Sequence, residues 1–296
     1  MAFIRPDLLR KSLKHLAEIA PKVLYVSIDG PRNIAEHKLV SQCRSMVLNP
    51  SWECEVIPLF HDHNVGLVKS FVNGMNLMFS EHEFGIFLED DVLLSPSFAD
   101  FALEIFVRFK DDSRVGHINA SNFLPKYESA NDYSYYFSQY SHVWGFGTWS
   151  RMWKKYDLNM KAWKSVDQKK LIYEHAFSMR ERKNITKMFN LHCENQDPWA
   201  CDYQWQFSLL FNHALSVTPI DNMSVNIGFE REDSTHTKGR NPMASPLSQC
   251  AFPLKHPSVI ERSVCYDKVL AKKMCPSYSS LYFNKIVNKL NPFSYI

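Results

Sequence analysis

The chain has 296 residues, of which 45% are hydrophobic and 22% are charged. This composition is typical of a globular protein and excludes the disordered and fibrous classes. A formal net charge of +3 is too small to indicate nucleic-acid binding. No apolar run approaches the ~20 residues of a membrane span and no signal-peptide core begins the sequence, so we expect a cytoplasmic protein. Seven cysteines without a CxxC pair agree with a reducing compartment.

The first 120 residues alternate between helical and strand patterns. Predicted helices cover residues 6–20, 35–48, 67–79 and 98–109, and predicted strands cover 23–28, 55–60, 86–88 and 114–119. Such alternation predicts an α/β domain with a mostly parallel central sheet flanked by helices, as in Rossmann-like folds.

The second half has a different character. Residues 127–140 are polar and contain five tyrosines, which predicts a loop over a site. Further helical patterns cover 154–195 and 199–211, a strand covers 215–220, and a charged loop covers 228–240. Prolines and serines from residue 241 onward predict a tail that wraps the domain and carries an amphipathic helix. We therefore expect one domain, 1–240, followed by a C-terminal tail, 241–296.

Three acidic residues, Glu89, Asp90 and Asp91, directly follow the predicted buried strand 86–88. Carboxylates at the end of a buried strand are costly unless they are compensated, and a hard cation such as Mg²⁺ or Mn²⁺ is a usual compensation. In an extended loop, neighbouring carboxylates would face opposite ways, so that one binds metal and the next a ligand hydroxyl. The alternative is structural, because acids ahead of a helix favour its N-terminal dipole.

Four other positions carry a functional and a structural alternative. Asp29 ends a strand and is a nucleotide contact or a plain turn residue. Asp202 lies among aromatic residues and is a proton acceptor or a helix cap. His236, in a polar loop, is a metal or phosphate ligand or a solvated side chain. For His61 and His63 the solvated alternative is the better one.

Three features in this order resemble the GT-A fold of nucleotide-sugar glycosyltransferases. They are the segment 27–32 (SIDGPR), the segment 88–91 (LEDD), and the aromatic, glycine-containing segment ahead of Asp202. The likeness covers residues 1–237 and is greatest to inverting N-acetylglucosaminyltransferase I and to bacterial GT-A proteins. It implies a metal-dependent inverting transferase that moves a sugar, from a UDP-sugar by preference, to a hydroxyl of a glycan or lipid-linked acceptor.

The resemblance also implies roles for individual residues. Those placed at the donor are Phe3, Arg5, Asp29, Lys69, Glu89, Asp90, Trp144 and Gly145. Asp91 matches the ligand of Mn²⁺ or Mg²⁺, His236 matches a histidine of the loop over the diphosphate and is expected to assist as a metal ligand, and Asp202 matches the catalytic base. The chain departs from the family in two places. Its first strand is a stub before Pro6, which predicts a displaced start or a sheet lacking most of an edge, and the interval from Gly147 to Asp202 is longer.

Two other functions stay open. A non-catalytic nucleotide-sugar-binding subunit of a glycan assembly complex would keep Asp29 and the acids but turn over no donor. A sugar nucleotidyltransferase would need a glycine-rich basic loop after its first strand, where this chain has Ile4-Arg5-Pro6. For the apolar face of residues 279–296, packing on the domain is the usual explanation, and a peripheral membrane contact is the alternative.

Overall fold

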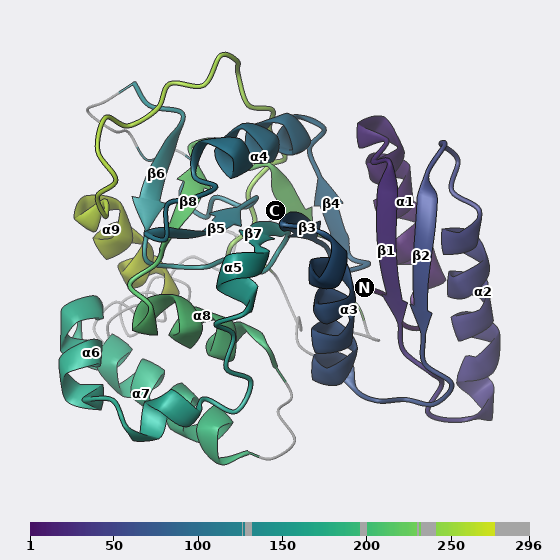
Figure 1. Cartoon of the computed structure of the whole chain (residues 1–296), viewed down its shortest axis with the longest axis horizontal. Coiled ribbons are helices and arrows are strands. Elements are labelled where there is room, and N and C mark those ends of the chain that lie inside the picture. Colours follow the sequence, from purple (N-terminus) through teal and green to yellow (C-terminus); the bar gives the residue numbers. More distant parts are fainter. Residues whose placement is uncertain (126, 128–131, 196–199, 230, 232–240, 276–296) are drawn as a thin grey trace, which may run out of the picture.

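The computed structural model describes residues 1–125, 127, 132–195, 200–229, 231 and 241–275. The predicted α/β class is confirmed. In this part of the chain, a small parallel unit of two strands stands beside a larger five-stranded sheet with helices on both of its faces (Figure 1). Within the described residues, no helix combines the length and apolarity that crossing a membrane requires.

The small unit comprises α1 (Pro6–Ile19), β1 (Val23–Ile28), the short turn η1 (Ile34–Glu36), α2 (His37–Leu48) and β2 (Glu55–Phe60). Pro6 suits the first turn of α1 because its missing N–H would have no helical partner there. Strands β1 and β2 pair in parallel. Their core contains Val26 of β1, Leu9 of α1 and Val40 of α2. Helix α3 (Leu67–Glu81) then leads into the larger sheet.

The larger sheet has the order β3-β7-β5-β8-β6. Its strands are β3 (Phe84–Phe87), β5 (Val115–Asn119), β6 (Tyr135–Ser138), β7 (Phe146–Trp149) and β8 (Leu215–Pro219). Only β5 and β8 are parallel, whereas the pairs β3–β7, β5–β7 and β6–β8 are antiparallel. The prediction of a mostly parallel sheet is therefore wrong for these five strands. A separate ladder joins β4 (Val92–Leu94) and β9 (Ser224–Asn226) in antiparallel fashion.

One of the antiparallel strands, β6, comes from a segment that we expected to be a loop over a site. Within the tyrosine-rich stretch, the residues of β6 are all buried. Tyr135 and Phe137 point into the main core, while Tyr136 packs against Tyr266 on the other face. The loop prediction for 127–140 is wrong here, because alternate tyrosines each fill one face of a buried strand instead of facing solvent.

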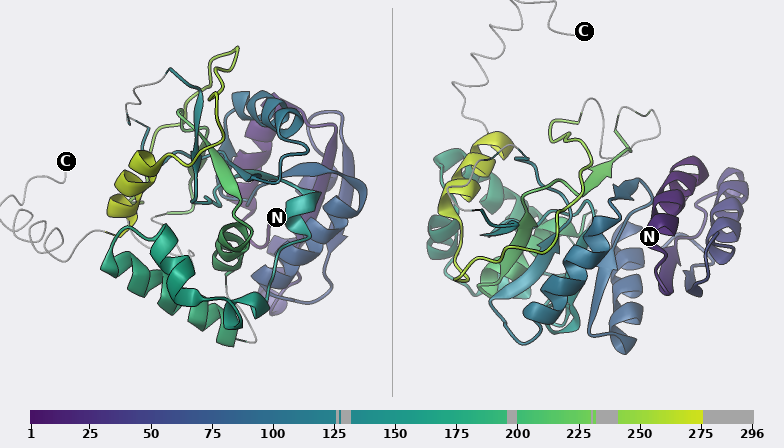
Figure 2. Two further views of the ribbon diagram at one scale, coloured as in Figure 1. Left: turned by 60° about the vertical axis from the view of Figure 1, so that its left-hand side comes forward. Right: turned by 90° about the horizontal axis from the view of Figure 1, so that it is seen from above.

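Helices cover both faces of the larger sheet (Figures 1 and 2). On one face lies α4 (Ser97–Arg108), whose phenylalanines fill the main core with Ile118 and Val217. On the other lies α8 (Asp202–Phe211), where Trp205 packs with Phe146 of β7 and Phe71 of α3. The short α5 (Ser150–Trp153) and η2 (Lys161–Lys164) lead to α6 (Gln168–His175) and α7 (Met179–Glu194), which pack around α8.

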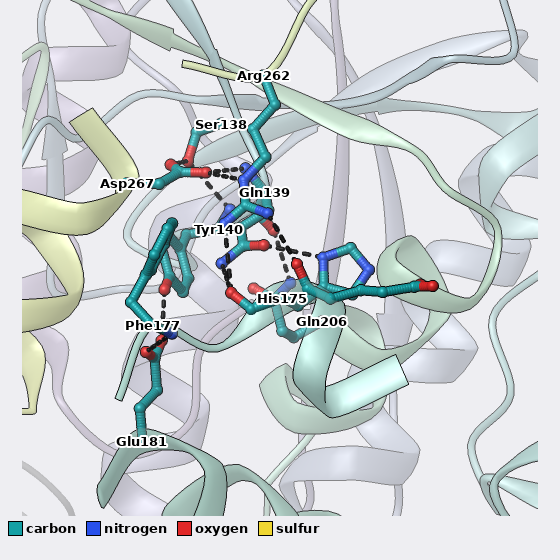
Figure 3. Close-up of polar contacts among 10 residues, drawn as sticks. Ser138, Gln139, Tyr140, His175, Phe177, Glu181, Gln206, Arg262 and Asp267 are labelled. Carbon is teal, nitrogen blue, oxygen red and sulfur yellow. Dashed lines mark hydrogen bonds and ion pairs between the residues drawn. The ribbon is translucent and has the colours of Figure 1, made fainter. Parts of the chain in front are cut away.

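Residues 241–275 run along β6 and end in α9 (Val264–Met274). A buried polar cluster fixes this helix, with Asp267 of α9 at its centre (Figure 3). The Asp267 carboxylate accepts hydrogen bonds from Ser138 Oγ, from Gln139 N at 3.2 Å and from Arg262 Nε at 2.7 Å. The contact joins α9 directly to the end of β6. The predicted helix at 279–296 lies outside the described residues.

Candidate functional site

The three acids form a tight turn at the carboxyl end of β3. Val92 N donates to Glu89 O at 3.2 Å, and both Asp90 and Asp91 are only about 4% exposed. Because the backbone turns here, the Asp90 and Asp91 side chains converge on one guanidinium instead of facing opposite ways. The extended-loop prediction is therefore wrong for these two residues.

The guanidinium belongs to Arg5, which precedes α1. Its Nη1 donates to Asp91 Oδ2 at 2.8 Å, its Nε to Asp90 Oδ2 at 3.4 Å, and its Nη2 makes a further close contact with Asp90 Oδ1. Burial opposes the charge on Arg5, but the two carboxylates outweigh that and raise its pKa above the usual value. One cation thus compensates two buried anions, which supplies from within the chain part of the compensation expected from a metal.

No residue in the described part of the chain pairs with the Glu89 carboxyl in this way, and this carboxyl keeps its proton to a higher pH than usual. Burial is the main cause, followed by the charges of Asp91 and Asp90, and together they raise the pKa of Glu89 to about 8. Beside it, the Met1 amino group donates to Leu88 O at 2.8 Å, and burial lowers the pKa of that amino group. A carboxyl group that titrates near neutral pH in this turn is a candidate for proton or hydroxyl chemistry.

The buried Asp91 faces the end of β9. Asn226 Nδ2 donates to Asp91 Oδ1 at 3.2 Å, and Ile227 N donates to Asp91 O at 2.8 Å. A Cβ added to Gly228 would lie 2.3 Å from Asp91 Oδ2, so the glycine backbone packs closely against this carboxylate and a larger residue would clash with it. A hard cation takes one or two carboxylates together with phosphate oxygens, and the carboxylate of Asp91 is a ligand of that kind. In this structure, Asp91 Oδ1 and Oδ2 accept hydrogen bonds from Asn226 and Arg5.

Trp144 and Gly145 lie at the same end of the sheet. Phe87 pairs with Phe146, so the residues ahead of β7 meet those that follow β3. Gly145 has φ +77°, and a Cβ there would stand 3.2 Å from Leu88 Cδ2. The half-buried ring of Trp144 meets Phe123 and Phe229 edge-on, at centroid distances of 5.0 and 5.5 Å. The structure therefore brings this predicted pair of residues to the acid turn.

The Asp29 carboxylate accepts hydrogen bonds from its neighbour Gly30 and from the loop 64–66 ahead of α3. Oδ1 accepts from Gly30 N and Val65 N, both at 2.8 Å, and Oδ2 accepts from Asn64 Nδ2 at 2.9 Å and Gly66 N at 3.0 Å. The carboxylate is buried and fixes the loop ahead of α3. This agrees with the structural alternative for Asp29, a turn-stabilising residue, although the loop that it holds lies further along the chain. Lys69 is exposed on the first turn of α3.

Phe3 and Asp202 lie on two other borders of the site. Phe3 is half-buried, with the Arg32 guanidinium 5.1 Å from its ring centroid. Asp202 is the first residue of α8, is half-buried, and accepts from Tyr203 N at 3.0 Å. Cys201, just ahead of α8, packs in the same apolar cluster as Phe87 at the end of β3, so the start of α8 lies close to the strand that leads into the acid turn. His236 lies outside the described residues.

Sequence reasoning missed a buried polar network behind Trp144. Trp205 Nε1 donates to His117 Nδ1 at 2.9 Å, and His117 Nε2 lies 2.8 Å from Asn119 Oδ1. The Asn119 oxygen also accepts from His142 N at 2.6 Å. Burial lowers the pKa of His117 to about 3 and that of His142 to about 4, so both imidazoles are neutral. In the strand pattern 115–119, the polar residues His117 and Asn119 at alternate positions were the sequence signal that could have indicated this network.

The close approach of Asn226 and Gly228 to Asp91 was also missed, because these two residues follow Asp91 by more than 130 residues. No protein-family model and no curated protein matched this chain. What defines the site is its position. Buried acids, an aromatic side chain and a helix start meet beyond the carboxyl ends of strands, which is where open α/β sheets bind their ligands.

Proposed function

We propose that this chain is a metal-dependent inverting glycosyltransferase of the GT-A type. It would move a sugar from a nucleotide-diphosphate donor, a UDP-sugar by preference, to a hydroxyl of a glycan or lipid-linked acceptor. The observation that carries the proposal is the buried acid turn, in which Asp90 and Asp91 converge beside Trp144 and Gly145. Arg5, which pairs with both carboxylates, would lie near the diphosphate of the donor.

Asp91 would hold Mn²⁺ or Mg²⁺ through its carboxylate, in exchange for the hydrogen bond that Arg5 Nη1 donates to Oδ2. When bound, the cation neutralises charge on the leaving nucleotide diphosphate. Arg5 lies beside Asp90 and Asp91 and would turn toward the diphosphate from there, and Lys69 would add a second, exposed cation. Glu89 and Asp90 are donor contacts, and the neutral carboxyl of Glu89 can donate a hydrogen bond as well as accept one.

Asp202 would act as the base. The acceptor hydroxyl attacks the anomeric carbon from the face opposite the diphosphate, a C–O bond forms, and the bond to the diphosphate oxygen breaks. The hydroxyl proton passes to the Asp202 carboxylate. Its place at the start of α8 suits the ionised form, because Tyr203 N–H and the helix dipole both favour a negative charge there.

The donor sugar would lie against Trp144, whose ring is held edge-on by Phe123 and Phe229. Gly145 lets the backbone approach Leu88 closely, so the ring remains next to the acid turn. Asp29 contributes through the loop 64–66 that its carboxylate fixes, and Phe3 closes the nucleotide side.

Three conservative variants test the proposal with a sugar-transfer assay in Mn²⁺. We expect Asp91→Asn to lose metal-dependent transfer, and Asp202→Asn to lose turnover while it still binds donor. The matched control is Asp132→Asn, at an exposed surface pair with Lys255, which should transfer at the wild-type rate. Wild-type turnover by Asp202→Asn would show that the base assignment is wrong. Metal-dependent donor binding without turnover on any acceptor would favour the non-catalytic binding subunit.

A further inference from the structure

Between β1 of the small unit and β3 of the larger sheet there is a position that a further β-strand could occupy. Among the described residues, β1 pairs along its length with β2 alone, and β3 pairs with β7 alone. Each strand therefore presents one edge of backbone N–H and C=O groups toward the other. The residues of β3 and the first half of β1 are only half-buried or exposed, although they lie in the middle of the molecule, whereas β5, β6 and β7 are fully buried.

Met1 and Ala2 occupy one end of this position and show its width. Ala2 N donates to Ser27 O at 3.0 Å, and Asp29 N donates to Ala2 O at 3.4 Å, which makes a parallel bridge to Ile28. On the other side, Met1 N donates to Leu88 O. The carboxyl ends of β1 and β3 are thus joined through a single intervening strand, a separation of about 10 Å or two strand spacings. This short segment therefore lies between β1 and the end of β3, and not at an edge of the sheet as one of the two expectations for it had it.

Beyond Met1 the position opens into a cavity of about 840 Å³. Its sides are Val23 to Ser27 of β1 and the strand β3 with Leu88. Its two faces are helices, with Leu13 and Leu16 of α1 on one and Phe71 and Met75 of α3 on the other. Figure 1 shows the amino terminus between β1 and α3, at the border of the two units.

The geometry points to this cavity as a strand-binding site, whose occupant is an apolar β-strand of about five residues that runs parallel to β1 and leads into Met1. Direction follows from the parallel bridge between Ala2 and Ile28, and entry follows from the position of the Met1 nitrogen at the end of the cavity. A peptide N–H in place of the amino group would donate to Leu88 O without a buried charge.

The cavity walls set the chemistry of the occupant. Helices lie on both faces, so every side chain of the strand would be buried, and a continuous run of Val, Ile and Leu fits better than an alternating pattern. Both edges also offer hydrogen-bonding groups that a wholly apolar small molecule leaves unpaired, while a strand pairs with both of them. The inference is independent of the proposed transferase activity, because it rests on the two free strand edges, the cavity between them and the bridge at Ala2.

The test compares the full chain with chains extended at Met1. One extension carries about six Val and Ile residues. A second has the same length in Ser and Gly, and a third repeats the Val and Ile residues with prolines at alternate positions, which removes N–H donors. We expect the first to raise Tm by about 5 °C or more over the Ser/Gly chain. It should also slow hydrogen exchange at the free-edge amides of β1 and β3 by about 100-fold.

Equal Tm and equal exchange for the Val/Ile and Ser/Gly chains would overturn the inference. So would an equal gain from the proline-interrupted extension, because apolar cover without strand pairing would then suffice. A fluorescent fatty acid provides the remaining comparison. If it binds the unextended chain and is excluded by the Val/Ile extension, the strand occupies the cavity. If it binds both chains equally, the strand does not.

Discussion

Arg5 is the side chain on which the acid turn depends most, and Arg5→Met removes its charge while keeping most of its aliphatic length. The substitution leaves Asp90 and Asp91, each about 4% exposed, without their shared cation. Loss of one partner of a buried ion pair costs ~3–5 kcal/mol. Because the Arg5 side chain is itself 24% exposed, we expect the lower end, ~3 kcal/mol of unfolding free energy, and a fall in Tm of about 6 °C or more.

Thermal unfolding at pH 7.5 and low salt measures this effect, with and without Mn²⁺. Arg114→Met is the matched control, because Arg114 makes a two-pronged pair with Asp112 at the surface, where its side chain is 63% exposed. We expect little change in Tm for the control. Mn²⁺ should stabilise Arg5→Met more than the wild type, since Arg5 no longer competes for Asp91 Oδ2. A loss no larger than that of the control would refute the reasoning.

Three further predictions concern buried titrating groups. The pKa of Glu89 is raised from an ordinary 4.5 to about 8 in the folded protein. Glu89 therefore costs no free energy of unfolding below pH 4.5, and the loss of stability that it causes grows as the pH rises to 8. Glu89→Gln should therefore stabilise at pH 8 and have little effect at pH 4.5, as followed by urea unfolding. The lowered pKa of His142, about 4 against 6.5, gives the opposite sign, with stability lost as the pH falls below 6.5. His142→Gln, which keeps a donor for Ser121 O, should gain ~2 kcal/mol relative to wild type between pH 7.5 and pH 5, and no relative gain would contradict this. Asp267→Ala should cost ~3–5 kcal/mol and expose α9 to limited proteolysis, whereas Asp132→Ala should do neither.

The first half of the fold follows from local sequence patterns. Leu8, Leu9 and Leu13 recur at helical spacing after Pro6, and the observed α1 begins at Pro6 as that pattern predicts. The strand pattern at 23–28 likewise coincides with β1. These elements are recognisable because their apolar period and their turn residues agree.

Strand β6 could not be predicted in this way, because both of its faces are buried. Tyr135 and Tyr136 point to different cores, so the segment lacks the alternation of apolar and polar residues that marks a half-buried strand. The direction of the sheet depends on β6 and β7, and it was therefore mispredicted along with them. Long-range pairing decides such cases, and no local pattern reports it.

For the site, the sequence indicated the acid cluster and the neighbourhood of Trp144. It did not indicate that Asp90 and Asp91 share Arg5, because a turn rather than an extended loop sets their directions. Nor did it indicate that Gly228 borders Asp91, a contact that depends on the β4–β9 ladder. The self-contained hydrogen bonding of Asp29 likewise depends on residues 64–66, which only the fold brings back to β1.

The most direct test of the central claim is a calorimetric titration with UDP-, GDP-, CMP- and dTDP-sugars, each with and without Mn²⁺. We predict that at least one of these donors binds, that Mn²⁺ tightens its binding, and that Asp91→Asn loses the part that depends on the metal. If none of the four classes of donor binds in either condition, the proposal that this chain is a nucleotide-sugar glycosyltransferase is wrong.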